Sequence, residues 1–179
     1  ATLRPYQKVG YQWLKTMAFY GMGCILADDM GLGKTLQAIL YICSNPGDKT
    51  LIVCPTSLAY NWQEEFERFA PSIRTKIVSG APEERREAIE SIKQEDVLIT
   101  TYPLIRKDME WYRNYKFDHM FIDEAQFIKN PNSLSAKAVK SISAAHRFAL
   151  TGTPIENALS ELWSIFDFIM PGFFMKYSK

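Results

Sequence analysis

The sequence alternates between short apolar runs rich in β-branched residues and longer segments in which apolar residues recur at helical spacing. Strands separated by helices pair in parallel, and the helices cover both faces of their sheet. The alternation therefore predicts an α/β fold with a mostly parallel central sheet. The predicted strands are the runs Gly23–Ala27, Thr50–Cys54, Lys76–Val78, Asp96–Thr100, Met120–Asp123 and Phe148–Thr151. Ligands of such sheets bind beyond the carboxyl ends of the strands, so chemistry is expected in the loops that follow them.

Four of the segments between these runs carry an apolar stripe that we expect to face the sheet. The stripes consist of Leu36, Ile39, Leu40 and Cys43; of Leu58, Trp62, Phe66 and Phe69; of Ala88, Ile89 and Ile92; and of Leu159, Leu162, Ile165, Phe166 and Ile169. Turns are expected at Ser44–Lys49 and at Gly80–Pro82.

The bulk composition fits one globular domain covering residues 1–179, of which 47% are hydrophobic. A domain of this size buries roughly 70% of its unfolded surface. No run approaches the roughly 18 apolar residues that span a bilayer, so no membrane partner is expected. The net charge is only +1, so any contact with DNA must be a local groove. The three cysteines lack metal-ligand spacing, which indicates free thiols in a reducing compartment.

A glycine-containing loop joins the first predicted strand to a helix. It reads Asp28-Asp29-Met30-Gly31-Leu32-Gly33-Lys34-Thr35. Its two glycines let backbone N–H groups approach phosphate oxygens, and the helix N-terminus adds a partial positive charge. Lys34 offers a point charge for the β- and γ-phosphates, and Thr35 offers a hydroxyl for Mg²⁺. The strict pattern has glycine where Asp28 stands, which leaves a glycine turn with an incidental lysine as the alternative. The position between strand and helix favours an ATP site.

An acidic pair, Asp123-Glu124, ends another hydrophobic strand. Ionised carboxylates at such a place are costly unless they meet a cation, and a magnesium–ATP complex provides one. Asp123 would hold the metal, and Glu124 would orient or deprotonate the attacking water. The alternative is an acidic first turn of the next helix.

A third strand end carries Thr151-Gly152-Thr153-Pro154. Its two hydroxyl groups could reach Glu124, Gln126 or a phosphate. The alternative is a strand that leads into a polar turn.

Taken in order, these motifs identify a family. The sequence resembles the Swi/Snf-type ATPases, the double-stranded-DNA translocase branch of helicase superfamily two. The resemblance covers essentially the whole chain. It rests on Leu3-Arg4-Pro5-Tyr6-Gln7, Ala27 to Gln37, Pro55-Thr56-Ser57-Leu58 with Asn61-Trp62, Thr100-Thr101-Tyr102, Asp123 to Gln126 with Lys129-Asn130, and Leu150 to Asn157. It implies a RecA-like lobe of the P-loop NTPase type, which binds ATP and Mg²⁺.

The resemblance also implies roles for single residues. Gln7 corresponds to the residue that reads the adenine edge. Residues Asp29 to Thr35 correspond to the nucleotide loop, with Lys34 on phosphate and Thr35 on Mg²⁺. Asp123 and Glu124 correspond to the metal and water residues. Gln126, Thr151, Gly152 and Thr153 correspond to the positions that couple hydrolysis to motion. Thr56, Ser57, Thr100 and Thr101 resemble positions that contact the DNA backbone, although turn and capping hydroxyls are the alternative.

Two departures from the family pattern affect these expectations. Asp28-Asp29 stands where the family usually has aspartate-glutamate, and Gln126 stands where histidine is frequent. Glutamine still donates and accepts hydrogen bonds, so hydrolysis should survive, while its coupling to movement is in question. The glutamine form favours a bacterial or archaeal source and a place in the cytoplasm with the nucleoid; a eukaryotic protein would be nuclear.

The family implies a second RecA-like lobe that supplies arginine fingers. An arginine finger accelerates hydrolysis by ~10³–10⁵-fold, so we expect this lobe alone to be nearly inactive. The favoured function is a translocase that tracks double-stranded DNA and displaces proteins bound to it. A strand-separating helicase and a non-hydrolysing ATP-dependent switch or scaffold stay open. In the switch hypothesis, a partner could dock on Trp111, Tyr112 and Tyr115. The alternative is that these side chains are half-buried by ordinary packing.

Overall fold

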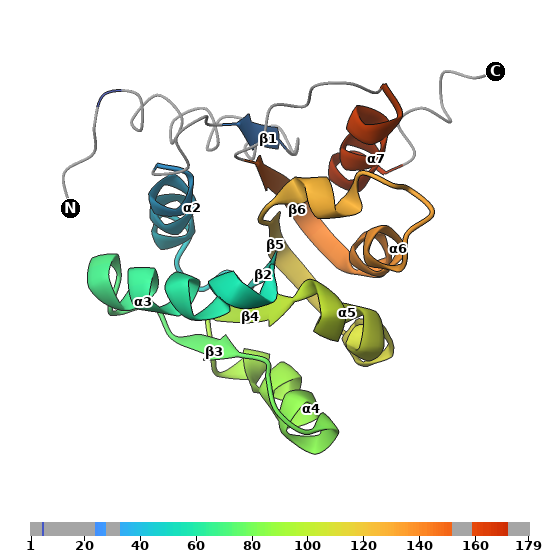
Figure 1. Cartoon of the computed structure of the whole chain (residues 1–179). Coiled ribbons are helices and arrows are strands. Elements are labelled where there is room, and N and C mark those ends of the chain that lie inside the picture. The colour runs from blue at the N-terminus through green and yellow to red at the C-terminus, as the bar shows by residue number, and fades with distance from the viewer. Residues whose placement is uncertain (1–4, 6–23, 28–32, 152–158, 172–179) are drawn as a thin grey trace.

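The computed structural model of the chain describes residue 5 and residues 24–27, 33–151 and 159–171; of 24–27 and 159–162 it describes the backbone. Six strands form one sheet in the order β1-β6-β5-β2-β4-β3, and every pairing is parallel (Figure 1). The α/β fold that the alternation predicts is therefore confirmed. The strands are β1 (Cys24–Ala27), β2 (Thr50–Cys54), β3 (Thr75–Ile77), β4 (Val97–Thr101), β5 (Lys116–Ile122) and β6 (Ser143–Thr151).

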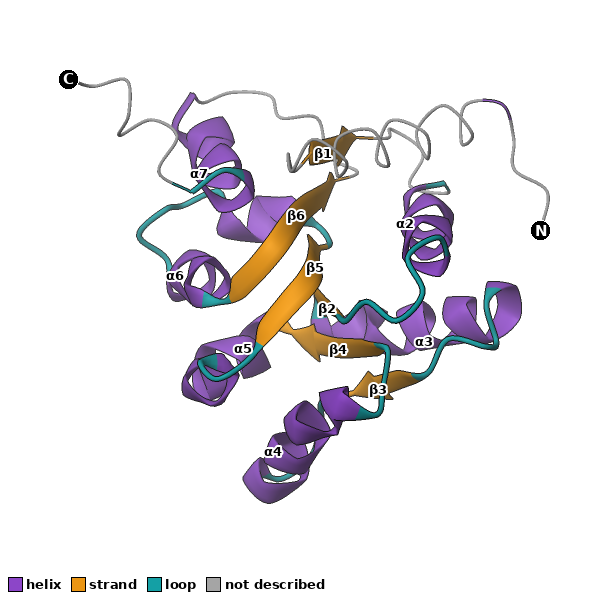
Figure 2. Ribbon diagram, turned by 180° about the vertical axis from the view of Figure 1, so that it is seen from behind, coloured by secondary structure: helices purple, strands orange, loops and turns teal. Residues whose placement is uncertain are grey.

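Helices cover both faces of the sheet (Figure 2). The α-helices are α2 (Lys34–Cys43), α3 (Ala59–Phe69), α4 (Pro82–Glu90), α5 (Tyr102–Asp108), α6 (Leu134–Ser141) and α7 (Leu159–Ile169). Short 3-10 helices are η1 (Thr56–Leu58), η2 (Ser91–Lys93), η3 (Met109–Tyr112) and η4 (Ala125–Ile128). Helices α2 and α3 pack with Ile52, Phe121 and Phe148 on one face, whereas α4 to α7 pack with Leu51, Leu98 and Met120 on the other. None of the described helices is long and apolar enough to cross a membrane.

Two strands begin earlier than the apolar runs predict. β5 starts at Lys116, not Met120, and β6 starts at Ser143, not Phe148. Lys116 pairs with Ser143 in register, so both strands are extended by residues that alternate between exposed and buried positions. The first half of each strand contains polar residues, so a search for continuous apolar runs does not detect it. The other boundaries agree within a residue.

The buried face of α2 differs from the predicted stripe. Ile39 is buried as expected, but Leu36, Leu40 and Cys43 are only half-buried. Their place on the sheet is taken by Ala38, Tyr41 and Ile42. Tyr41 packs edge-on against Phe148, with ring centroids 5.0 Å apart, so an aromatic cluster decides how the helix is rotated.

The other predicted stripes agree better with the structure. Trp62 and Phe66 of α3 are buried, flanked by half-buried Leu58 and Phe69; Ala88, Ile89 and Ile92 are all buried. In α7, Ile165 and Ile169 are buried and Phe166 is half-buried, whereas the side chains of Leu159 and Leu162 lie outside the described set. Of the three aromatic residues weighed for docking, Tyr112 is buried and Trp111 and Tyr115 are half-buried against the core, as the packing alternative predicts.

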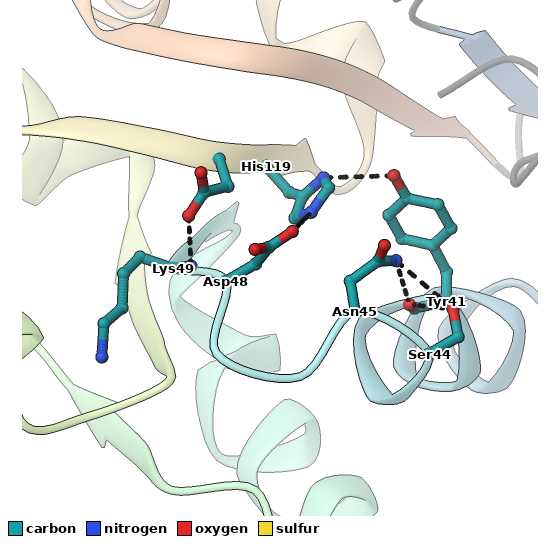
Figure 3. A network of polar contacts seen from close by, with 7 residues as sticks. Tyr41, Ser44, Asn45, Asp48, Lys49 and His119 are labelled. Carbon is teal, nitrogen blue, oxygen red and sulfur yellow. Dashed lines mark hydrogen bonds and ion pairs between the residues drawn. The ribbon is translucent and has the colours of Figure 1, made fainter. Parts of the chain in front are cut away.

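A polar network closes the turn between α2 and β2 (Figure 3). The Tyr41 hydroxyl lies 3.1 Å from Nδ1 of His119, and Nε2 of His119 lies 2.8 Å from Asp48 Oδ2. The backbone N–H of Lys49 donates to Asp118 Oδ2 over 2.7 Å. Because this turn precedes β2, the network lies at the amino-terminal edge of the sheet, opposite the edge where ligands are expected.

Candidate nucleotide and magnesium site

The carboxyl ends of three neighbouring strands place the predicted site residues on one edge of the sheet. In the β1–β6 pair Ala27 is level with Thr151, and in the β5–β6 pair Ile122 is level with Ala149. The nucleotide loop follows β1, the acidic pair follows β5, and Thr151 ends β6. Parallel pairing therefore brings the three motifs to the same rim. Gln7, Asp29 to Leu32, Gly152 and Thr153 lie outside the described residues.

The first turn of α2 has the character of an anion site. Gly33 is the N-cap of this ten-residue helix, and the first turn holds no acidic residue. The N–H groups and partial positive charge of a helix N-terminus suit a phosphate. The next two residues are Lys34, which is 4% exposed, and Thr35, which is half-buried.

Asp123 is a buried carboxylate, only 7% exposed. The Trp62 indole N–H donates to Oδ2 over 2.9 Å, and the backbone N–H of Glu124 donates to Oδ1 over 2.9 Å. Burial raises the pKa of Asp123 above its ordinary value; the two hydrogen bonds and the positive charge of Lys34 act in the opposite direction.

These groups fit magnesium and a triphosphate. Within the described part of the chain, the Lys34 side chain makes no hydrogen bond or ion pair, and a phosphate would give its ammonium group charged hydrogen bonds. A desolvated carboxylate gains in the same way from a cation. No group of three or more His, Cys, Asp or Glu residues that could hold a metal occurs among the described residues. Mg²⁺ takes one or two carboxylates and leaves its other positions to water and phosphate, so a single carboxylate such as Asp123 suffices for it.

Glu124 is held in an uncommon backbone conformation. Its φ of +51° makes it the only non-glycine residue with positive φ in the described ranges. Such a conformation costs of order 1–3 kcal/mol and concentrates at functional sites. Nε2 of Gln126 donates to Glu124 Oε2 over 2.5 Å, and the Thr151 hydroxyl donates to Gln126 Oε1 over 3.3 Å. Of the partners considered for Thr151, the structure has Gln126. A side-chain relay thus joins the end of β6 to Glu124.

The four predicted DNA-contact residues differ in exposure. Thr56 and Ser57 are exposed on η1. Thr101 is 5% exposed at the end of β4, and Thr100 is completely buried. In this conformation the Thr100 hydroxyl is therefore not accessible to DNA, and the assignment of Thr100 as a DNA-contact residue stays a prediction. Thr100 shares the inner face of β4 with Leu98, and its hydroxyl lies against the buried Tyr112.

Comparisons with known proteins identify the family. The profile of the SNF2-related domain matches residues 6–179. The chain belongs to the SNF2-related domain family. An ATP-dependent helicase of Mycoplasma genitalium, described as uncharacterized, is 44% identical over 176 residues, which are 96% of this chain and 17% of the relative. A TATA-binding protein-associated factor of Saccharomyces cerevisiae is 42% identical over 189 residues, which are 97% of this chain and 10% of the relative.

A solved structure supports the same assignment. The SWI2/SNF2 ATPase core of Sulfolobus solfataricus in complex with double-stranded DNA superimposes with a TM-score of 0.86 at 42% identity, covering 96% of this chain and 36% of that one. The present chain is thus an ATPase domain of the SNF2-related family with a RecA-like fold. It spans between a tenth and a sixth of the two curated relatives above.

Sequence reasoning missed two residues that hold the acidic motif of this SNF2-related domain. Trp62 was expected only to pack in the core, and Tyr102 was given no role. The Trp62 indole binds the Asp123 carboxylate, and the Tyr102 hydroxyl donates to the Asp123 carbonyl oxygen over 2.6 Å. The available signal was chemical: a buried tryptophan or tyrosine almost always has a hydrogen-bond partner, so a Trp within an apolar stripe calls for an acceptor nearby.

Proposed function

We propose that this chain is the ATP-binding lobe of a motor that hydrolyses ATP, moves along double-stranded DNA and displaces proteins bound to it. The observation that supports the proposal is the parallel pairing in the order β1-β6-β5, which puts the carboxyl ends of the strands before Lys34 and before Asp123 on one rim of the sheet. The solved ATPase core bound to double-stranded DNA supports the DNA partner, and the relative associated with the TATA-binding protein supports DNA-bound proteins as targets.

The proposed mechanism assigns one task to each residue. Lys34 and the first turn of α2 bind the phosphates, and Thr35 and Asp123 hold the magnesium ion. Bound Mg²⁺ neutralises charge on the phosphates. Glu124 Oε1 or Oε2 orients the attacking water and accepts its proton. Gln126 donates a hydrogen bond to Glu124 and accepts one from Thr151. A change in the position of Glu124 would therefore be transmitted through Gln126 to the end of β6. Gly152 and Thr153 continue that coupling segment in the sequence.

The remaining groups of the nucleotide site would come from other segments of this chain and from a second lobe. We assign Gln7 to the adenine edge and Asp29 to Gly33 to the phosphates on the family resemblance. A second RecA-like lobe would supply arginine fingers worth about 4–7 kcal/mol of transition-state stabilisation. This chain covers 36% of the solved ATPase core, which agrees with one lobe of two.

The DNA contact is proposed to be weak and independent of base sequence. The exposed hydroxyls of Thr56 and Ser57, and the chain at Thr101, would contact the phosphate backbone, which positions a protein without reading the bases. The Mycoplasma relative is described as a helicase, so strand separation is the second candidate. Unwinding of a forked duplex and displacement of a third strand, measured side by side on the complete protein, separate the two. The compartment would be that of the DNA, the nucleoid or the nucleus.

The variant Glu124→Gln tests the function in the complete protein. Because the amide cannot accept the proton of the attacking water, DNA-stimulated hydrolysis should fall at least about 100-fold, while binding of a fluorescent ATP analogue is retained. Glu87→Gln is the matched control, since Glu87 is exposed on α4 and should leave both quantities unchanged. Unchanged displacement of DNA-bound protein by Glu124→Gln would instead support an ATP-dependent switch.

A further inference from the structure

Asp123 is fixed at all four of its polar groups. Its backbone N–H donates to the Val53 carbonyl over 2.7 Å. Its carbonyl oxygen accepts the Tyr102 hydroxyl, its Oδ1 accepts the Glu124 N–H, and its Oδ2 accepts the Trp62 indole N–H. Each carboxylate oxygen therefore has one direction occupied by a donor. The other lone pairs of the two carboxylate oxygens remain for a cation.

The two side chains that hold Asp123 come from elements next to the proposed DNA contacts. Trp62 lies in α3, which directly follows η1 with its exposed Thr56 and Ser57. Tyr102 begins α5 immediately after Thr101. Each DNA-contact segment is thus connected to Asp123 by a few residues of chain and one hydrogen bond. A shift of either segment would change the direction of the Asp123 carboxylate or of its backbone.

Packing alone does not account for these two residue types. Trp62 and Tyr102 are 2% and 1% exposed, and phenylalanine would fill most of either space. Their polar atoms both end on Asp123. The Tyr102 ring also stacks on Phe127, with centroids 4.9 Å apart and planes 4° from parallel. Phe127 belongs to η4, the turn that follows Glu124, so Tyr102 contacts the acidic motif on both sides of the catalytic residue.

We propose that Trp62 and Tyr102 are positioning residues that carry DNA contact at η1 and at the start of α5 to the magnesium-binding carboxylate of Asp123. The proposal rests on the function proposed above and adds a route between its two ligands. Trp62 acts on the carboxylate itself and should have the larger effect. Tyr102 acts through the peptide group and the η4 turn.

The test measures binding of a fluorescent ATP analogue to the complete protein while MgCl2 is titrated, with and without duplex DNA. Trp62→Phe keeps an aromatic ring and removes the N–H. It should raise the MgCl2 concentration at half-maximal binding about tenfold, the factor expected for loss of one hydrogen bond to a charged group. It should also abolish most of the shift that duplex DNA produces in this titration. Tyr102→Phe should change both quantities in the same direction by a smaller factor.

Phe66→Leu is the matched control, because Phe66 is equally buried, packs beside Trp62 on α3 and has no polar atom to offer Asp123. It should lower Tm without moving the magnesium titration. Should Trp62→Phe prevent folding, Tyr102→Phe decides. Folded Trp62 or Tyr102 variants with an unchanged titration and an unchanged DNA effect would overturn the proposal, as would an equal shift in Phe66→Leu. Failure of the wild type to bind the analogue in a magnesium-dependent way would instead refute the proposed function.

Discussion

Two pairs of buried charged residues in the described part of the domain are built differently. Arg85 on α4 and Asp108 at the end of α5 have side chains only 10% and 0% exposed. Nε of Arg85 donates to Asp108 Oδ2 over 2.9 Å, Nη2 donates to Oδ1 over 3.0 Å, and Nη1 donates to the Gly80 carbonyl over 2.8 Å. At the carboxyl edge, Lys34 and Asp123 are also buried residues, but within the described residues they form no ion pair.

This difference separates charges that stabilise the fold from charges that serve a ligand. The charged groups of the Arg85–Asp108 pair bind to each other and to the Gly80 carbonyl, so their interaction energy stabilises the folded chain without any ligand. The Asp123 carboxylate bears desolvation without a counter-charge bonded to it, which a magnesium–triphosphate would offset. The contrast predicts opposite responses to mutation at the two places.

Removal of one partner of the paired site should have the largest effect on stability. Asp108→Ala leaves a buried guanidinium without its counter-charge and should lower the free energy of unfolding by about 3–5 kcal/mol, measured by urea denaturation. Glu110→Ala is the matched control, since its ion pair with Arg113 is exposed and should contribute less than about 1 kcal/mol. Equal losses in the two variants would show that burial of the Arg85–Asp108 pair adds nothing.

The corresponding change at the carboxyl edge should spare stability and abolish binding. Lys34→Met removes an ammonium group that forms no ion pair within the described residues, so the free energy of unfolding should change by less than about 1 kcal/mol. Affinity for magnesium–ATP should fall at least tenfold, because a charged hydrogen bond to phosphate is lost. Lys107→Met, on the exposed side of α5, should alter neither quantity. A loss of several kcal/mol in Lys34→Met would make the lysine a structural residue.

How far the sequence predicts this fold and site depends on the kind of signal. Lys34, Thr35, Asp123 and Glu124 stand in loops after apolar strands, so parallel pairing alone brings their motifs to one edge. The burial of Thr100 could not be predicted, because β4 is buried on both faces. Such a strand lacks the alternation of polar and apolar residues that would show which way a side chain points.

The hydrogen bonds of Trp62 and Tyr102 could not be predicted from local patterns. Trp62 meets Asp123 across the β2–β5 pairing, and Tyr102 meets it across β2 from the end of β4. Such contacts depend on strand order, which residue spacing does not specify. The rotation of α2 was missed for a similar reason, because Tyr41 is held by His119 and Phe148 of two other elements.

The smallest predicted effect concerns pH and the amino-terminal edge. His146 stacks on His119 with centroids 5.3 Å apart, and burial, followed by the charge of His119, lowers the pKa of His146 below its ordinary 6.5. The folded state therefore resists protonation of His146, and the unfolded chain takes up the proton first as the pH falls. Stability should be fully present above pH 6.5 and decrease below it, by the uptake of at most one proton. His146→Gln should flatten that slope in urea denaturation measured between about pH 7 and 5; an unchanged slope would assign it to other groups.

The central claim is that Lys34, Thr35, Asp123 and Glu124 surround a single magnesium–triphosphate. A crystal structure with Mn²⁺ and a non-hydrolysable ATP analogue, in which the anomalous signal of manganese marks the metal, tests it most directly. We predict one manganese peak at bonding distance from the Thr35 hydroxyl, with Asp123 bound directly or through one water and Lys34 on the phosphates. A nucleotide seated elsewhere, or a metal peak that contacts neither Thr35 nor Asp123, would contradict the account.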